Sequence, residues 1–196
     1  MNYLTGYDGW SFYVPQVVII SLDSEDPVWI GRKQDANGAK ITTFLNDENI
    51  LGYPEKFIQS PPIHPFDFVT KFLENRNWSN KNIGVEMDSY YYTAESHYRL
   101  TSHCPNAKFI NAHLLVNWIR LVKSNAEIDY MKKASTLVQL GMQRAYDSIK
   151  PDIRQNEVTG NIQQSLISGN DKMGGEYSGL TIILASGSAA SAAHLT

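Results

Sequence analysis

The sequence predicts an α/β fold, in which helices flank a mixed sheet, followed by a second region that begins with helices. Two observations support this prediction. Up to about residue 118, short segments rich in Val, Ile and aromatic residues alternate with helix-like segments, as they do where helices pack on a sheet. Between residues 128 and 149, apolar residues instead recur every three or four positions, which is typical of an amphipathic helix.

The first region opens on an apolar, aromatic run at residues 1–5 that we interpret as a strand already under way. We therefore expect the polypeptide to start further upstream. Gly6 and Gly9 enclose a predicted turn, since glycine allows positive φ. Residues 12–22 and 28–31 are predicted strands because they are rich in β-branched and aromatic residues, and the first is continuous enough to be buried on both faces.

The remainder of this region continues the alternation of strands and helices. We predict a turn at residues 35–38, a third strand at residues 41–45, and further strands at residues 83–86 and 109–112. Pro65 suits the first position of a helix. A second helix, capped by Asp88 or Ser89, is predicted to run to about Ser102. The first domain is therefore predicted to span residues 1–118.

The second region starts with a capping box, in which Ser124 and Glu127 each satisfy a free backbone N–H. The long helix is predicted to stop at Pro151. A second helix is predicted at residues 157–168, ended by Gly169, and a short strand at residues 180–184. Two helices and one strand can cover little apolar surface, so we expect residues 119–196 to be an incomplete domain.

Composition narrows the functional classes. Of the 196 residues 42% are hydrophobic and the formal net charge is −3, as in ordinary globular proteins. No basic cluster indicates nucleic acid binding. No apolar run approaches the roughly 20 residues of a membrane-spanning helix, and a basic signal-peptide start is absent. The single Cys104 excludes an internal disulfide, so we expect a cytoplasmic protein.

Three stretches resemble a known family, and one of them, residues 187–196, is similar to the loop where members of that family carry a substrate-binding histidine. The segment around the capping box resembles the one by which creatinase, aminopeptidase P and prolidase enter their catalytic pita-bread domain. Residues 3–16 look most like the ectoine hydrolase branch of that family. The resemblance implies a creatinase-type N-terminal domain followed by the start of a pita-bread α+β domain, in a fragment that lacks both ends. The positions that carry the resemblance around the capping box are Arg120, Lys123, Ser124, Glu127, Ile128, Met131 and Ala134.

His194 is the first candidate for a functional residue. An imidazole with a pKa of about 6.5 can donate to or accept from a substrate at neutral pH. The Gly, Ser and Ala residues before it allow a ligand to approach the backbone. The resemblance implies that His194 binds substrate and takes part in catalysis. Relatives in the ectoine hydrolase branch usually have Pro before this histidine, where this chain has Ala193.

The turn containing Tyr7, Asp8 and Trp10 is the second candidate. In creatinase-like dimers the first domain of one subunit reaches over the active site of the other. The resemblance therefore implies a homodimer in which these side chains contact a small cationic or zwitterionic substrate. The alternative is that Tyr7 and Trp10 only fill the core of their own domain.

No metal ligand is assigned to this chain. Many relatives hold two divalent ions (Mn, Co or Zn) through two Asp, one His and two Glu, which lie later in their sequences than the equivalent of Thr196. The acids after residue 119 and the other histidines lack ligand spacing. We expect no cofactor in this chain.

Taken together, the residues and the resemblance predict a fragment of a hydrolase that acts on a C–N bond of a small substrate, most like ectoine hydrolase. One alternative is an Xaa-Pro aminopeptidase or prolidase-like metallopeptidase with a dipeptide-like substrate. Another is a pita-bread module that binds peptides or proteins without catalysis. Because the attacking groups of the family lie beyond Thr196, we expect the chain alone to be inactive.

Overall fold

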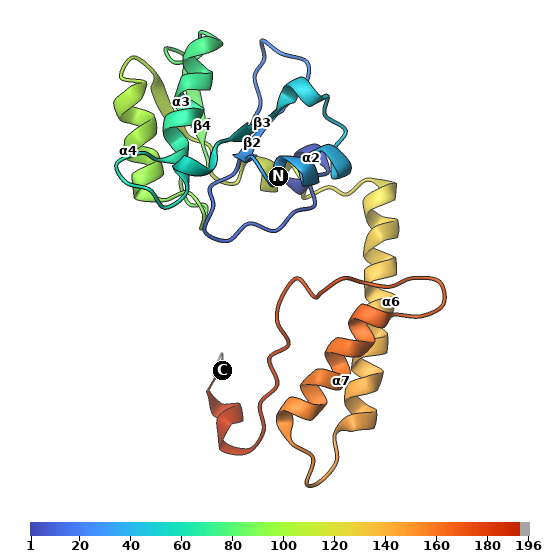
Figure 1. Ribbon diagram of the computed structural model, residues 1–196. Coiled ribbons are helices and arrows are strands. Elements are labelled where there is room, and N and C mark those ends of the chain that lie inside the picture. The colour runs from blue at the N-terminus through green and yellow to red at the C-terminus, as the bar shows by residue number, and fades with distance from the viewer. Residues whose placement is uncertain (193–196) are drawn as a thin grey trace. The chain divides into compact units, whose positions relative to one another are not determined.

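The computed structural model describes residues 1–192. The chain forms two compact units, Met1–Ile119 and Arg120–Thr196 (Figure 1). Strands occur in the first unit, and the described part of the second unit contains helices and extended chain. No helix in residues 1–192 is long and apolar enough to cross a membrane.

The first unit has the predicted mixed α/β architecture. In one sheet β1 (Val17–Ile19) pairs antiparallel with β2 (Val28–Arg32), which pairs parallel with β3 (Ile50–Tyr53). Strands β4 (Asn82–Val85) and β5 (Lys108–Asn111) form a separate parallel pair. The α-helices of this unit are α1 (Asn2–Thr5), α2 (Ala36–Thr42), α3 (Pro65–Asn75), α4 (Ala94–His103) and α5 (Leu115–Ile119), and 3₁₀ turns lie at Asp47–Asn49 and Glu55–Phe57.

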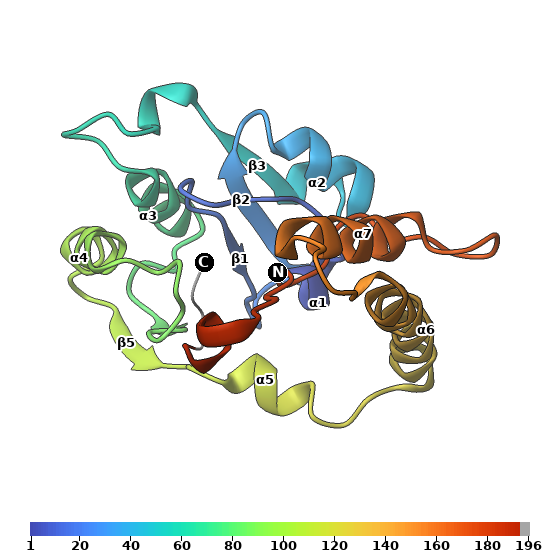
Figure 2. The same cartoon turned by 90° about the horizontal axis from the view of Figure 1, so that it is seen from below.

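Strand β2 lies between two cores because its side chains alternate between the faces of the sheet. Val28 and Ile30 pack into a cluster that contains the buried face of α3. Trp29, which is fully buried, packs into the other cluster with Ala36 and Ala39 of α2. Figure 2 shows α2 and α3 on opposite sides of β2. Burial on both faces explains why this short strand has an almost continuous apolar sequence.

The second unit is built on a helical hairpin of α6 (Asn125–Ser148) and α7 (Gln155–Ser168), which lie side by side in Figure 1. The predicted capping box is present, since Glu127 Oε2 accepts from Ser124 N (2.7 Å) and Ser124 Oγ accepts from Glu127 N (3.3 Å). Ala145, Val158 and Ile162 form the buried core. A 3₁₀ turn, η3 (Gly187–Ser191), follows an extended segment.

The apolar face predicted for the long helix is only partly covered. Met131, Val138 and Met142 are each more than half exposed. Helix α7 instead packs beside Gly141, where an added Cβ would lie 2.6 Å from Leu166 Cδ2. The hairpin therefore depends on close approach of the helices at Gly141.

Three predictions about the start of the chain are wrong. Residues 1–5 contain the short helix α1 rather than a strand, because Met1 O accepts from the amides of Leu4 and Thr5. The predicted turn at residues 35–38 is the first part of α2, which carries buried alanines three positions apart. The predicted strand at residues 41–45 begins inside that helix, and the third strand is β3 instead.

Three other elements differ in extent or type. The strand predicted at residues 12–22 is reduced to β1, since Pro15 lacks an N–H for the ladder. Helix α4 starts later than predicted, because its N-cap is Thr93, whose Oγ1 accepts from Ser96 N. Residues 180–184 form no strand, since no other strand lies in the described part of their unit.

Candidate functional site

The predicted turn between Gly6 and Gly9 lies in irregular chain at residues 6–11, and its Tyr7 is in the core. Tyr7 is 4% exposed and its ring lies 5.2 Å from that of Trp29. Its hydroxyl accepts from Gln16 Nε2 (3.3 Å), which also donates to Asp35 Oδ2 (3.1 Å). Burial raises the pKa of the Tyr7 phenol. Tyr7 is therefore an anchor for the turn and is largely closed to solvent.

Asp8 and Trp10, in contrast, are exposed. Asp8 is held through its backbone, whose N–H donates to Thr42 Oγ1 (3.1 Å), so the carboxylate remains at the surface. Trp10 is 67% exposed and stacks on Phe12 with 6.1 Å between ring centroids. The alternative that these aromatic residues fill the core therefore holds for Tyr7 and not for Trp10. An acid and an indole at the surface can contact a cation or zwitterion.

The carboxyl ends of β2 and β3 lie close to the segment that follows this turn. Arg32, at the end of β2, binds Glu55 through Nε (3.0 and 2.9 Å) and Nη2 (2.6 Å). Tyr53, opposite Arg32 in the register, donates from its hydroxyl to Pro15 O. Because Glu55 already pairs with Arg32, this edge offers structural support for the turn rather than a free charge.

A second candidate site lies at the start of α4. An open depression of about 330 Å³ is lined by Met87, Tyr92, Thr93, Ala94 and His97. The Tyr92 hydroxyl lies 2.9 Å from His97 Nδ1. Burial raises the pKa of Tyr92 to about 12, so the phenol keeps its proton and can donate it to Nδ1. In that arrangement His97 carries its own proton on Nε2.

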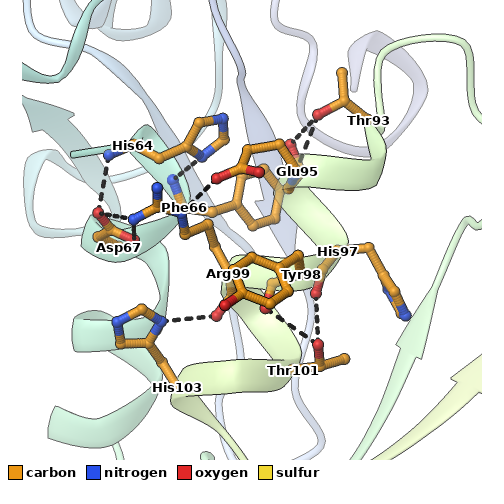
Figure 3. A network of polar contacts seen from close by, with 11 residues as sticks. His64, Phe66, Asp67, Thr93, Glu95, His97, Tyr98, Arg99, Thr101 and His103 are labelled. Atoms are coloured by element: carbon orange, nitrogen blue, oxygen red, sulfur yellow. Dashed lines mark hydrogen bonds and ion pairs between the residues drawn. The ribbon is translucent and has the colours of Figure 1, made fainter. Parts of the chain in front are cut away.

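A polar network joins the N-terminal ends of α3 and α4 (Figure 3). Arg99 Nε donates to Glu95 Oε1 (2.6 Å), and Arg99 Nη1 lies 3.4 Å from both carboxylate oxygens of Asp67. Asp67 Oδ2 also accepts from His64 N (2.8 Å). These charges are mutually paired across two helices, so the network stabilises the packing of α3 on α4.

The described residues do not fit a metal centre. Within residues 1–192 no group of three or more His, Cys, Asp or Glu side chains could hold a metal ion. His113 and Asp88 approach within 3.5 Å, but only as a pair. We therefore assign no metal-dependent step to these residues. His194, the predicted substrate-binding residue, lies outside the described residues.

The first unit coincides with a recognised domain. Residues 1–122 match the model of the creatinase/prolidase N-terminal domain. The chain belongs to this family. The family resemblance inferred from residues 3–16 and from the capping box is thereby confirmed.

Curated relatives in the creatinase/prolidase family are similar along most of the chain. Ectoine hydrolase of Halomonas elongata is 40% identical over 202 aligned residues, which cover 100% of this chain and 50% of that protein. An uncharacterised hydrolase/peptidase of Sinorhizobium fredii is 42% identical over 175 residues, covering 89% of this chain and 45% of its own length. The chain thus spans about half the length of these curated relatives.

Solved structures of the family share the fold. An Xaa-Pro dipeptidase from Bacillus anthracis has a TM-score of 0.61 at 20% identity and covers 84% of this chain, which corresponds to 40% of that structure. The X-Pro aminopeptidase of Thermotoga maritima has a TM-score of 0.63 at 19% identity. The match covers 84% of this chain and 41% of the aminopeptidase. At these identities the likeness concerns the fold, and it confirms the predicted fold class.

The sequence motifs did not indicate Tyr92 and His97. Neither residue belongs to a recognisable catalytic motif, and they lie five positions apart on either side of a helix start. The local signal that could have located them is Thr93 followed three residues later by Ser96, which places the N-cap of α4 between them.

Proposed function

We propose that this protein is a hydrolase that cleaves a C–N bond of a small cyclic substrate similar to ectoine. The observation that supports this proposal is the 40% identity to the Halomonas elongata ectoine hydrolase, which extends over the whole chain. An identity confined to residues 1–122 would speak only for the N-terminal domain. Because it also includes α6, α7 and the segment after them, it supports a shared substrate class as well.

In the proposed reaction, water adds to the ring carbon that is bonded to nitrogen, and the C–N bond then breaks. The leaving nitrogen takes a proton, so the ring opens without any change in oxidation state. We propose that His194 binds the substrate and moves this proton, as the imidazole pKa near neutrality allows.

We further propose that Asp8 and Trp10 contact the substrate from the first unit of a second copy in a homodimer. Their exposure supports this role, because an exposed carboxylate and indole can meet a charged small molecule. The buried Tyr7 would act behind them by holding the turn.

A substrate comparison tests the proposal. The protein, purified at the length at which its source produces it, is incubated separately with ectoine and with an Xaa-Pro dipeptide, each with and without a chelator. We expect the ectoine ring to open and the dipeptide to remain intact. If neither ectoine nor the dipeptide were cleaved, the result would contradict hydrolysis and would favour a binding module.

The second candidate is an Xaa-Pro peptidase, and the Bacillus anthracis and Thermotoga maritima structures favour it through their fold. In the same comparison this alternative predicts cleavage of the dipeptide, loss of that cleavage with chelator, and no opening of ectoine. We expect the 196-residue chain by itself to open no ectoine. Ring opening by that purified chain would show this expectation to be wrong.

A further inference from the structure

The side chain of Gln155 makes three hydrogen bonds to a segment about thirty residues away in the sequence. Its Nε2 donates to Leu184 O (2.7 Å). Its Oε1 accepts from Ser186 N (3.1 Å) and from Ser186 Oγ (2.8 Å). One carboxamide thus bonds the backbone on both sides of Ala185. We refer to these contacts as the Gln155 clamp.

The Gln155 clamp reproduces the hydrogen bonds of a parallel β-strand. In a parallel pair, the N–H of one residue donates to the residue before its partner and its C=O accepts from the residue after the partner. Gln155 bonds Leu184 and Ser186 in that way, with Ala185 as the partner. It therefore satisfies the Leu184 carbonyl, at the end of the predicted strand at residues 180–184, and the Ser186 amide just beyond it. The described part of the unit has no neighbouring strand that could bond these two groups.

The clamp joins the first residue of α7 to the end of the extended segment. In Figure 1 the chain returns alongside α7 towards the start of that helix, where Gln155 is the first residue. Ile182 and Leu184 pack against the core of Val158 and Ile162. Ser186, the last residue that the clamp holds, is also the N-cap of η3. Apolar packing thus holds residues 182 and 184 against α7. The clamp fixes which residues of the segment lie beside Gln155 and where the chain enters η3.

We propose that Gln155 is a positioning residue that fixes residues 184–186 and, through them, the entry to the small-residue segment that leads to His194. This inference rests on the proposed function, because it assigns Gln155 to the substrate-binding segment of that hydrolase. Gln155 acts through the backbone of this segment and has no assigned contact with substrate.

The clamp is tested by amide hydrogen exchange at Ser186 in the 196-residue chain. In Gln155→Ala the Ser186 amide should exchange about tenfold faster than in wild type, since local opening no longer breaks hydrogen bonds. Gln164→Ala is the matched control, because Gln164 lies on the same helix and is exposed, and it should leave the exchange rate unchanged. Equal rates in wild type and Gln155→Ala would overturn the clamp. Far-ultraviolet circular dichroism checks that α6 and α7 remain folded.

Gln155→Glu provides a second variant with its own signature. A carboxylate can accept from Ser186 but cannot donate to Leu184 O, whereas a protonated carboxyl can do both. After correction for intrinsic exchange, Ser186 protection in this variant should rise as pH falls through the carboxyl pKa of about 4.3. The wild type should lack this step. A Gln155→Glu profile identical to that of the wild type would contradict the assigned hydrogen bonds.

Turnover separates positioning from a purely structural clamp. In the protein at its natural length, Gln155→Ala should lower kcat/KM for ectoine by about 10- to 100-fold, as expected for a displaced catalytic segment, while Gln164→Ala should not. An unchanged kcat/KM together with faster Ser186 exchange would support the hydrogen bonds of the clamp but would overturn the positioning role of Gln155. A wild-type protein that does not open ectoine would contradict the proposed function, and the positioning role of Gln155 would fall with it. The exchange rates at Ser186 would still show whether the hydrogen bonds of the clamp form.

Discussion

Gly9 is the residue at which the predicted turn is most restricted. A Cβ at this position would lie 2.2 Å from the hydroxyl oxygen of Tyr7 and 2.3 Å from its Cζ. The Tyr7 ring cannot move away, because it is buried against Trp29. The absence of a side chain at residue 9 therefore lets the turn close over the tyrosine.

We predict that Gly9→Ala destabilises the first unit by about 1–3 kcal/mol, the usual cost of overpacking. Urea denaturation followed by circular dichroism measures this change. Gly160→Ala is the matched control, since a Cβ there meets no atom within 4 Å. Because Gly160 lies inside α7, alanine should stabilise that helix by up to about 1 kcal/mol. Equal effects of the two substitutions would contradict the steric argument.

His64 is an unusual helix cap because its ring nitrogen acts as the acceptor. Nδ1 accepts from Phe66 N (3.2 Å) at the start of α3, which requires that nitrogen to be unprotonated. Burial lowers the pKa of His64, and Arg99 lowers it further, while Glu95 and Asp67 act in the opposite direction. Burial is the largest of these effects, so the folded protein favours the neutral ring.

The lowered pKa of His64 predicts a pH dependence of stability. Below pH 6.5 the unfolded chain takes up a proton that the folded chain resists, so the unfolded state binds more protons. The free energy of unfolding should therefore decline as pH falls from about 6.5 towards the folded pKa, and this histidine should have no effect above that range. Titration of the His64 ring by NMR and urea denaturation at several pH values measure both quantities.

His64→Asn separates this effect from other titrations. Asn is a good N-cap and does not titrate, so the variant should keep α3 and lose this part of the pH dependence. A His64 pKa at or above 6.5 in the folded wild type would show the assignment to be wrong.

Among the elements, α6 has the best-defined start. The Ser124–Glu127 capping box satisfies free N–H groups, and the Ser124 backbone and hydroxyl lower the pKa of Glu127. We predict that Ser124→Ala destabilises the second unit by about 0.5–2 kcal/mol. Ser135→Ala, at an exposed position inside the same helix, is the control and should be neutral or slightly stabilising. Thermal unfolding followed by helical circular dichroism distinguishes the two variants.

Elements with a local chemical signal could be predicted from the sequence. Pro65 opens α3, Ser124 caps α6 and Gly169 ends α7, because each position depends on neighbouring residues alone. The strand predicted at residues 180–184 failed for the opposite reason. Ile182 faces the core and Ile183 is 58% exposed, so the alternation of a strand is present. Residues 120–192 contain no other strand that could pair with it, and an alternating pattern in one segment does not reveal its pairing partner.

The candidate site likewise has features that the sequence could predict and features that it could not. Glycine spacing predicted a turn between Gly6 and Gly9, where the structure has irregular chain. That pattern has no period that could show that Tyr7 is buried and Trp10 exposed. The Gln155 clamp joins residues 29 to 31 positions apart. Such contacts depend on the folded hairpin and leave no local pattern.

At the scale of the whole molecule, the cores of the two units are separate. Both clusters around β2 lie within residues 1–119, and the cluster of Ala145, Val158 and Ile162 lies within the second unit. We predict that residues 1–119 fold when expressed alone, since their core needs no residue from the remainder. Amide NMR spectra that superimpose on those of the full chain are the expected result. Collapsed, unresolved spectra would show that the first unit depends on the second.

The buried Trp29 that closes the core beneath Tyr7 also determines how the chain can be observed. All four tryptophans, at positions 10, 29, 78 and 118, lie in the first unit. Trp29 and Trp78 are buried, whereas Trp10 and Trp118 are each 67% exposed. Tryptophan fluorescence therefore reports on the first unit alone, and a soluble quencher should act mainly on the two exposed tryptophans. Unfolding of the α6–α7 hairpin leaves this emission unchanged wherever the units unfold independently, so one sample can report both transitions through two optical signals.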